Sequence, residues 1–221
     1  MPDRIQPTGE ISTGFFILNL GFVSSYVFDA GDSLVAFDAG MNHNKVIAEM
    51  KKLNLDPAKV SAILFTHSDP DHTGGTAAFP NAKPHFSKAE VAMFDHSTAR
   101  FFGWLYARPP RFDYDTLEDG QELSVGNASI TCISTPGHTS GSMSYLINGT
   151  ILIVGDELNM KSGKAVLDRK FIGIDNTKRL ESIHNLAKLT GVKVICPAHS
   201  GYSKDFDGAM QEWRSGEWPV P

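Results

Sequence analysis

Two histidines and two aspartates lie within six positions of this chain, in the His-Ser-Asp-Pro-Asp-His stretch at residues 67–72. An apolar run, residues 60–65, precedes the stretch and is typical of a buried strand, and Gly74 and Gly75 follow it. Imidazole nitrogens and carboxylate oxygens at this density can bind a divalent metal ion without help from cysteine. The alternative is a polar turn that happens to be rich in His and Asp.

Further side chains of the same kinds stand just beyond apolar runs later in the chain. His138, Asp156 and His199 each follow a run that is typical of a strand. Ligands gather where strand ends converge, because the strands hold the backbone while the loops stay free. Seven nitrogen and oxygen ligands suffice for two metal ions that share a carboxylate, and the candidates are His67, Asp69, Asp71, His72, His138, Asp156 and His199. The other histidines lack this placement and are expected at the surface or in packing positions: His43, His85, His96 and His184.

An alternation of strands and helices must position these residues in the first half of the chain. Strands are expected over residues 15–18, 22–28 and 33–37, and the last of them ends at Asp38. A helix then precedes the strand that leads to His67. Its apolar face is formed by Val46, Ile47, Met50 and Leu53.

The second half repeats this rhythm. Gly126-Asn127 and Asn148-Gly149 are strong hairpin signals between alternating strands. The next helix is expected to end at Gly191, and its apolar face is formed by Leu180, Ile183, Leu186 and Leu189. The tail from Trp213 is expected to be irregular. Because no linker or low-complexity run interrupts the chain, one domain over residues 1–221 with two similar halves is the economical interpretation.

The order of these motifs resembles the metallo-β-lactamase superfamily. The signature of that family is His-x-His-x-Asp-His, followed by a distant histidine, a bridging aspartate and a final histidine. The resemblance extends over most of the chain and is carried by the strand before the motif, Thr66, His67, Asp71, His72, Gly74, Pro136-Gly137-His138, Gly155-Asp156 and Pro197-Ala198-His199. Several elements in the right order are far more specific than a lone motif.

The resemblance implies an α/β fold, an αββα four-layer sandwich of two mixed β-sheets flanked by helices, with the site at one edge of the two sheets. Asp38 matches a family position that braces the site, which is consistent with support of a ligand imidazole. The implied ligand set is His67, residue 69 and His138 for one metal, Asp71, His72 and His199 for the other, and Asp156 as the bridge.

One position departs from the family pattern, because Asp69 stands where the second histidine is usual. Zinc favours imidazole, whereas an added carboxylate suits harder ions such as iron or manganese. The flavodiiron proteins, which are relatives within the superfamily, use a carboxylate at this place and bind two irons. Two interpretations stay open: Asp69 ligates a metal directly, or its short side chain leaves a weakened first metal site.

An aromatic-rich insertion is expected around residues 94–116, and its sequence resists a periodic assignment. Just before it, Ser87 is expected to cap a helix over residues 88–94, with Glu90 at the third position. The insertion could form a lid or pocket wall, a partner-binding surface, or an excursion of the packed core.

Composition excludes several classes of protein. The chain has 221 residues, 41% of them hydrophobic and 20% charged, which fits one ordinary globular domain. The net charge of −5 and the lack of a Lys and Arg cluster argue against nucleic-acid binding. No apolar run is long enough to span a membrane, and no signal-peptide core is visible, so a cytoplasmic location is expected. Cys132 and Cys196 are therefore expected to be reduced core residues.

These expectations predict a metal-dependent hydrolase. Two divalent metal ions, zinc or iron with manganese as a further option, would hold a hydroxide that cleaves an ester, thioester or lactone-type bond. Asp71 would orient that nucleophile or take its proton. The predicted substrate is a small, partly apolar molecule, with no nucleic-acid or membrane partner, and a homodimer is compatible with the sequence.

Two other classes of function remain as alternatives. The first is a di-iron oxidoreductase with a flavodiiron-like site and no flavin domain, which Asp69 favours. The second is a non-catalytic metal-binding module. Among hydrolases of the superfamily, secreted β-lactamases, glyoxalase II-like enzymes and RNA-processing members are not expected, because the sequence shows no sign of their export signal, helical extension or basic surfaces.

Overall fold

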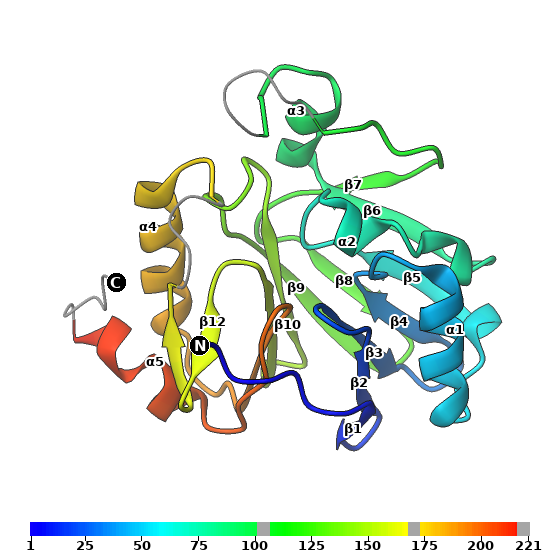
Figure 1. Ribbon diagram of the computed structural model, residues 1–221, viewed down its shortest axis with the longest axis horizontal. Coiled ribbons are helices and arrows are strands. Elements are labelled where there is room, and N and C mark those ends of the chain that lie inside the picture. The colour runs from blue at the N-terminus through cyan, green and yellow to red at the C-terminus, as the bar shows by residue number, and fades with distance from the viewer. Residues whose placement is uncertain (101–106, 168–172, 216–221) are drawn as a thin grey trace.

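Two β-sheets packed face to face form the centre of the molecule, and helices cover both outer faces (Figure 1). The computed structural model describes residues 1–100, 107–167 and 173–215. The first sheet and its helices come before the second sheet and its helices along the chain. Each of the two expected halves therefore forms one sheet layer and one helix layer.

The first sheet has the strand order β1-β2-β3-β4-β5-β6-β7. Strands β1 to β4 pair antiparallel, whereas β4 to β7 pair parallel, so the sheet is mixed as predicted. Its strands are β1 (Gly9–Ser12), β2 (Phe15–Asn19), β3 (Ser24–Asp29), β4 (Leu34–Phe37), β5 (Val60–Leu64), β6 (Lys83–Ser87) and β7 (Asp115–Leu117).

The second sheet has the strand order β14-β11-β10-β9-β8. Only β14 runs parallel to its neighbour β11, and the hairpins β8–β9 and β10–β11 turn at the two predicted dipeptides. Asn148 and Gly149 both have positive φ, 49° and 66°, which the tight turn requires. The strands are β8 (Glu122–Val125), β9 (Ala128–Ser134), β10 (Met143–Ile147), β11 (Ile151–Gly155) and β14 (Val194–Pro197), beside a separate hairpin of β12 (Asn159–Lys161) and β13 (Lys164–Val166).

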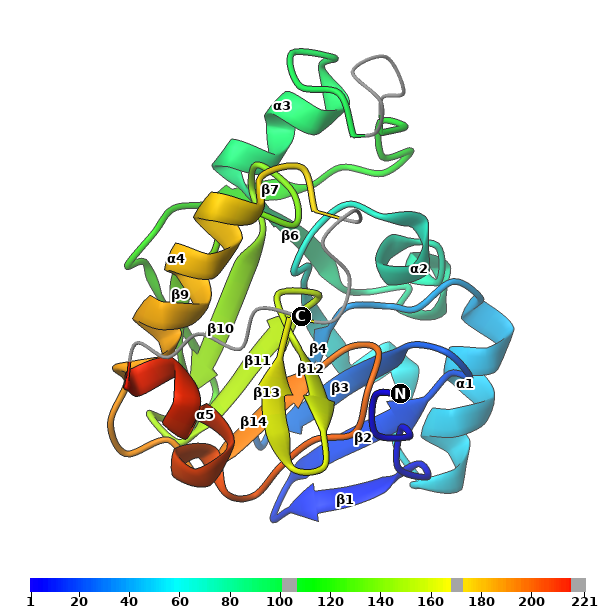
Figure 2. The same cartoon turned by 60° about the vertical axis from the view of Figure 1, so that its left-hand side comes forward.

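Helices cover the two outer faces. Helix α1 (His43–Lys52) lies on the first sheet, and α4 (Asn176–Ala187) and α5 (Phe206–Arg214) lie on the second (Figure 2). The short helices α2 (Pro70–Thr73) and α3 (Val91–Phe94) stand in loops at the strand ends. Asn42, Asp175 and Asp205 cap the longer helices, because each side chain accepts a hydrogen bond from the backbone N–H of the third helical residue.

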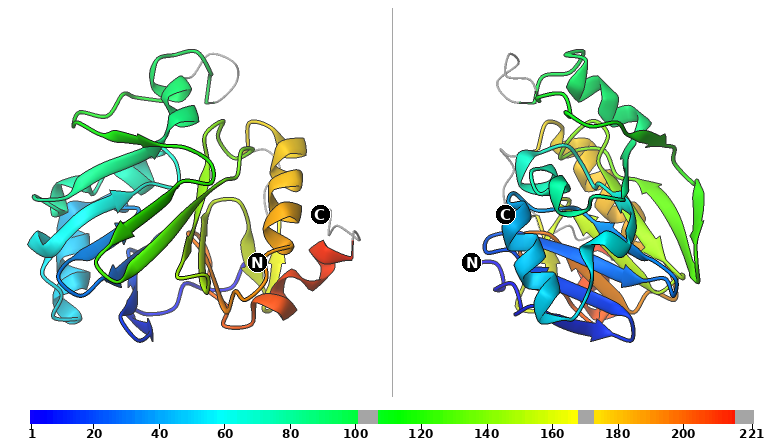
Figure 3. Two further views of the ribbon diagram at one scale, coloured as in Figure 1. Left: turned by 180° about the vertical axis from the view of Figure 1, so that it is seen from behind. Right: turned by 90° about the vertical axis from the view of Figure 1, so that its right-hand side faces the viewer.

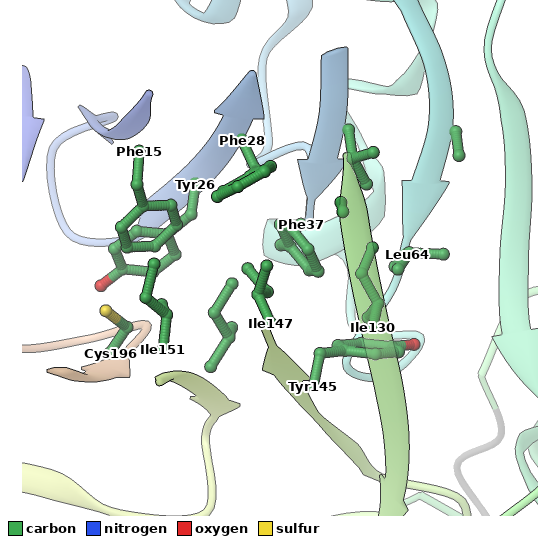
Figure 4. Close-up of a cluster of buried hydrophobic side chains, with 14 of the residues drawn as sticks. Phe15, Tyr26, Phe28, Phe37, Leu64, Ile130, Tyr145, Ile147, Ile151 and Cys196 are labelled. Atoms are coloured by element: carbon green, nitrogen blue, oxygen red, sulfur yellow. The ribbon is translucent and has the colours of Figure 1, made fainter. Parts of the chain in front are cut away.

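The core between the sheets is built from alternate residues of both inner faces. Figure 4 shows its aromatic and aliphatic side chains pointing toward one another across the gap between the sheets. Cys132 and Cys196 belong to this core as buried free thiols, which confirms the reading of both as reduced core residues. The aromatic members of the cluster are Phe15, Tyr26, Phe28, Phe37 and Tyr145.

Four local predictions are wrong. Phe22 does not belong to a strand, because β3 begins at Ser24 and the Phe22 side chain is 57% exposed. Ile47 faces outward and is 40% exposed, although Val46 and Met50 of the same predicted face are buried. Helix α4 ends at Ala187, before Gly191. Trp213 lies in α5, fully buried, where its indole N–H donates to the carbonyl of Ala165.

The predicted insertion is partly described. Residues 101–106, with their five apolar side chains, lie outside the described part of the chain, as does the tail over 216–221. Phe94, Phe112 and Tyr114 pack on Phe86, so this portion of the insertion extends the core around the first sheet. The segment that carries α3 projects beyond the sheets in both views of Figure 3.

Across the three described ranges, no helix has the length and apolarity needed to cross a membrane.

Candidate metal centre

The His-Asp stretch forms the loop and short helix that follow β5. Pro70 occupies the first turn of α2, where its missing N–H costs nothing, and Asp69 precedes it in extended backbone. The Asp69 carboxylate makes no capping hydrogen bond to the helix. Asp71 and His72 follow on the first turn of α2.

The other three candidates come from loops after strands of the second sheet. His138 follows β9, Asp156 follows β11 and His199 follows β14. Gly155 holds a positive φ of 54°, and a Cβ at this position would come within 2.6 Å of the Thr66 hydroxyl oxygen. The close approach between the β5 and β11 ends therefore depends on a residue without a side chain.

His67, Asp69 and His138 form a first cluster. Oδ2 of Asp69 is 3.4 Å from Nε2 of His67 and 3.3 Å from Nε2 of His138. Two ligands that are each about 2.0–2.1 Å from a tetrahedral ion lie about 3.3–3.4 Å apart. The three side chains therefore have the mutual spacing of ligands around one ion, and the shorter Asp69 side chain reaches far enough to be one of them.

Asp71, His72 and His199 form a second cluster. Nε2 of His199 is 3.2 Å from Oδ2 of Asp71, and Nε2 of His72 is 3.8 Å from the same oxygen. The three ligand atoms all lie within 4.8 Å of one another. This spacing also fits one ion, with room for small adjustments of the Asp71 side chain.

Asp156 lies between the two clusters. Its Oδ2 is 3.5 Å from Nε2 of His138 in the first cluster and 3.1 Å from Nε2 of His199 in the second. Its Oδ1 is 3.2 Å from Nε2 of His72. A carboxylate in this position can contact an ion in either cluster, so the structure brings all seven predicted residues to one place.

Three buried atoms in the middle of the site lack hydrogen bonds. Within the described residues, Nε2 of His67, Nε2 of His72 and Oδ1 of Asp156 make no hydrogen bond, although the last two atoms are 3.2 Å apart. Each of these three residues offers a ligand atom that lies within 4.8 Å of those of the other two. Buried polar atoms without partners are costly, and imidazole and carboxylate are ligands that zinc, iron and manganese accept. The residues present therefore fit a divalent metal ion.

In the absence of metal, two of the imidazoles favour the charged form, with a proton on both ring nitrogens. Burial is the largest single effect and lowers their pKa, but in both cases Asp156 and a second carboxylate together outweigh it. With the help of Asp38, Asp156 raises the pKa of His72 well above 6.5. With the help of Asp71, Asp156 raises the pKa of His199 to about 10. Metal binding at these nitrogens must therefore displace protons.

His138 has the opposite character. Burial lowers its pKa to about 3, although Asp156 and Asp69 act against that change. The ring is therefore neutral at ordinary pH and can offer a lone pair without first losing a proton.

Buried hydrogen bonds orient His72. Oδ2 of Asp38 is 2.8 Å from Nδ1 of His72, which leaves Nε2 of the ring facing the site. Asp38 also accepts hydrogen bonds from the backbone N–H and the hydroxyl of Thr66, each at 2.8 Å. The position predicted to brace the site thus supports a candidate ligand directly, as in other metal sites where a carboxylate orients an imidazole.

Glu90 supports the two loops that carry the first cluster, a role that the sequence does not predict. It was expected to complete a helix cap, and Ser87 does accept a hydrogen bond from its backbone N–H at 3.1 Å. Its carboxylate instead accepts from the backbone N–H of Ser68 at 2.8 Å and from the hydroxyl of Thr139 at 2.7 Å. This fully buried acid joins the loop after β5 to the loop after β9.

Two further residues contact the ligands without having been predicted to do so. Arg100, from the described part of the insertion, forms a paired hydrogen bond with Asp69, with Nε to Oδ1 at 2.8 Å and Nη2 to Oδ2 at 2.6 Å. Phe22 stacks on the His199 ring with centroids 6.0 Å apart, and its carbonyl is 2.8 Å from Nδ1 of His199. Only its place next to a strand end could have indicated Phe22, and nothing in the sequence links residue 100 to residue 69.

Comparison with known proteins matches residues 18–199 to the metallo-beta-lactamase superfamily. The chain is 25% identical over 201 residues to the lactamase-like protein nscB of Aspergillus fumigatus, a match that covers 89% of this chain and 53% of that protein. It is 26% identical over 167 residues to the N-acyl homoserine lactonase AttM of Azorhizobium caulinodans, with 67% and 62% covered. The chain thus matches less than two thirds of the length of either relative.

Solved structures share the fold. A B3 metallo-beta-lactamase, described as the first with an active site glutamic acid, aligns with a TM-score of 0.71 over 95% of this chain and 86% of that one. The two sequences are 21% identical. Together with the two mixed sheets and their outer helices, this likeness confirms the predicted four-layer fold.

Proposed function

Because the chain belongs to the metallo-beta-lactamase superfamily, we propose that it is a hydrolase that depends on two divalent metal ions. One observation carries the proposal: seven imidazole and carboxylate side chains from separate loops converge with neighbouring ligand atoms 3.1–3.8 Å apart. In this proposal the first cluster binds one ion, the second cluster binds the other, and Asp156 contacts both.

Asp69 is proposed as a direct ligand. Its distances to the two imidazoles of the first cluster are those of ligands that share one tetrahedral ion. The hydrogen bonds from Arg100, together with the neighbouring imidazoles of His138 and His67, outweigh the effect of burial and hold the pKa of Asp69 far below its usual range, so the carboxylate is charged whenever an ion arrives.

The proposed chemistry is hydrolysis at a carbonyl carbon. When bound, divalent ions at such a site activate water and polarise the substrate carbonyl oxygen. Asp71 lies at the open side of the site with its side chain 19% exposed, within reach of both solvent and the ligands. Although burial acts to raise it, the pKa of Asp71 is lowered by His199 and His72, so the carboxylate is ionised and can orient a water molecule or accept its proton.

The proposed substrate is a small ester, thioester or lactone with an apolar portion. Phe22 presents a large apolar side chain, 57% exposed, against the ring of His199, and so offers an apolar contact beside the second cluster. The relative named as an N-acyl homoserine lactonase acts on a substrate of this kind, which is consistent with the proposal.

A di-iron oxidoreductase is the second candidate. The carboxylate of Asp69 gives the first cluster an oxygen ligand beside two imidazoles, and this set suits iron or manganese better than three imidazoles would.

The two candidates separate in one experiment. Protein purified without added metal is analysed for zinc, iron and manganese, and is then assayed on a panel of esters, thioesters and lactones. We expect bound metal and chelator-sensitive hydrolysis, with loss of turnover in His72→Ala and unchanged turnover in His43→Ala, which alters an exposed histidine of α1. Iron with oxygen-dependent turnover and no hydrolysis would favour the oxidoreductase, and metal without any turnover would favour a binding module.

A further inference from the structure

Arg100 reaches into the first cluster and is almost completely buried there. Its side chain is 3% exposed, and its Nη2 is 2.6 Å from Oδ2 of Asp69 and 3.0 Å from Nε2 of His138. Oδ2 of Asp69 and Nε2 of His138 are also two of the three ligand atoms of the cluster. The guanidinium therefore contacts the same atoms that an ion would contact.

The guanidinium and a metal ion compete for Nε2 of His138. Arginine has only N–H donors and is always charged, so in the 3.0 Å contact Nε2 of His138 turns its one lone pair toward the guanidinium. The Asp69 oxygens also accept from the guanidinium but keep further lone pairs. A metal ion in this cluster needs the lone pair of His138. It would also carry positive charge to within a few ångströms of the guanidinium, in a buried site where like charges repel strongly.

The second cluster has no such neighbour. Among the described residues, the ion pairs of the Asp71 and Asp156 carboxylates are with the histidine ligands, and the guanidinium of Arg179 donates to the backbone carbonyl of Asp156 and not to a ligand atom. The two clusters therefore differ in the positive charge that faces their ligands. The first cluster contains the permanent charge of the Arg100 guanidinium, whereas the second contains protonated histidines that lose their protons as metal binds.

We propose that Arg100 occupies the first cluster in place of a metal ion, so that the protein binds one ion tightly in the second cluster and a second ion only when the guanidinium withdraws. This inference rests on the proposed function, since it assigns an order and a control to the binding of the two ions. It makes the segment after α3 a determinant of metal stoichiometry.

The chain around Arg100 suits such an exchange. Phe94, at the end of α3, is packed against Phe86 and is 6% exposed, so the start of the segment is fixed in the core. Residues 95–97 are exposed and residues 98–99 are half-buried. The guanidinium is thus carried into the site by an arm whose movement would leave the packing of α3 intact.

Metal counting tests the inference. Wild-type protein, Arg100→Met and Arg111→Ala are stripped of metal, titrated with zinc against a chromophoric chelator and analysed for bound zinc. Methionine keeps an apolar stem without the charge, and Arg111 is an exposed arginine of the same segment. We expect one tight ion in the wild type and in Arg111→Ala. In Arg100→Met we expect two, with the second bound at least about tenfold more tightly than in the wild type.

The outcomes separate this inference from the proposed function. Two ions bound with equal affinity by the wild type, or one tight ion in Arg100→Met, would overturn the role of Arg100 while leaving a metal site in place. No ion in any of these proteins would overturn both. If Arg100→Met does not fold, the Nε–H resonance of Arg100 in ¹⁵N-labelled wild type gives the answer. When one equivalent of zinc is bound, this N–H should be protected from hydrogen exchange with solvent, and it should lose that protection as a second ion binds. Persistent protection with two ions bound would contradict the inference.

Discussion

Oδ2 of Asp38 lies 2.8 Å from Nδ1 of His72, at the buried end of the site. The backbone of Asp38 has a positive φ of 59°, an unusual conformation for a residue other than glycine, and both residues are almost completely inaccessible to solvent. Since Asp38 follows β4 and His72 follows β5, the pairing of these parallel strands sets the direction of the imidazole.

Replacing Asp38 with asparagine should weaken metal binding in the second cluster. Asparagine tolerates positive φ, but it has one acceptor oxygen where aspartate has two. The backbone N–H of Thr66 already donates to Oδ1 of Asp38, whereas Oδ2 is shared by the Thr66 hydroxyl and Nδ1 of His72. The amide would then face Nδ1 of His72 with a donor and favour the ring form with its proton on Nε2. We expect affinity for zinc to fall about 10–100-fold, measured by chelator competition.

Asp32→Asn is the matched control, because Asp32 is exposed in the turn between β3 and β4. Equal zinc affinity in Asp38→Asn and Asp32→Asn would show that the buried carboxylate does not orient the ring.

Zinc binding at pH 7 should release protons. The raised pKa of His72 and the pKa of about 10 for His199 mean that both rings are protonated in the metal-free protein, whereas a ligand nitrogen must be unprotonated. We expect release of about two protons for the first ion, measured by titration calorimetry in buffers of different ionisation enthalpy. Apparent affinity should rise with pH up to about 10. A heat that does not depend on the buffer would contradict these protonation states.

The same rings affect the metal-free fold. A histidine whose pKa is raised on folding stabilises the protein below its unfolded pKa of about 6.5. For His199 that contribution is lost as the pH rises through about 10.

Glu49 should control stability in acid. Burial opposes its ionisation, but hydrogen bonds from Lys45, Lys52 and Thr8 outweigh burial and lower the pKa of Glu49 from 4.5 to about 2. The carboxylate therefore stabilises the fold above pH 4.5, and the contribution is lost as pH falls through about 2. Glu49→Gln should lower the free energy of unfolding at pH 7 by about 1–3 kcal/mol, measured by urea denaturation.

In Glu49→Gln, the difference from the wild type should shrink as the pH is lowered from 4.5 to 2. A difference that stays constant over this range would show that ionisation of Glu49 contributes nothing to the stability of the fold.

Asp69→His should shift metal selectivity towards zinc. The substitution makes the first cluster a set of three imidazoles and removes the carboxylate that Arg100 contacts. We expect the ratio of zinc to manganese affinity in that cluster to rise about tenfold or more, measured by competition between the two ions. Unchanged selectivity would show that Asp69 does not ligate metal.

The sequence predicts the fold and the gathering of the site because both depend on local patterns. Apolar runs mark the strands, and the polar residues that follow them mark the edge where the strand ends meet. Asp38 and His199 could be assigned to that edge for this reason. Local patterns do not predict the burial of Trp213, because that burial depends on contact with β13, a short strand far away in the chain.

Arg100 and Glu90 show why the rest of the site escapes sequence reasoning. Arg100 lies in the insertion without clear periodicity, and Glu90 lies in the first turn of a predicted helix. Each becomes buried through partners distant in sequence, which are Asp69 for Arg100 and both Ser68 and Thr139 for Glu90. A charged side chain is ordinarily a surface residue, and only the folded chain reveals the exception.

Anomalous diffraction from crystals soaked in zinc tests the central claim most directly. Data collected on both sides of the zinc absorption edge identify the ion without reference to any assay. The account predicts a strong peak about 2.0–2.1 Å from Nε2 of His72 and Nε2 of His199, beside Asp71 and Asp156. Peaks only elsewhere on the molecule, with these four side chains still in contact with one another, would contradict it.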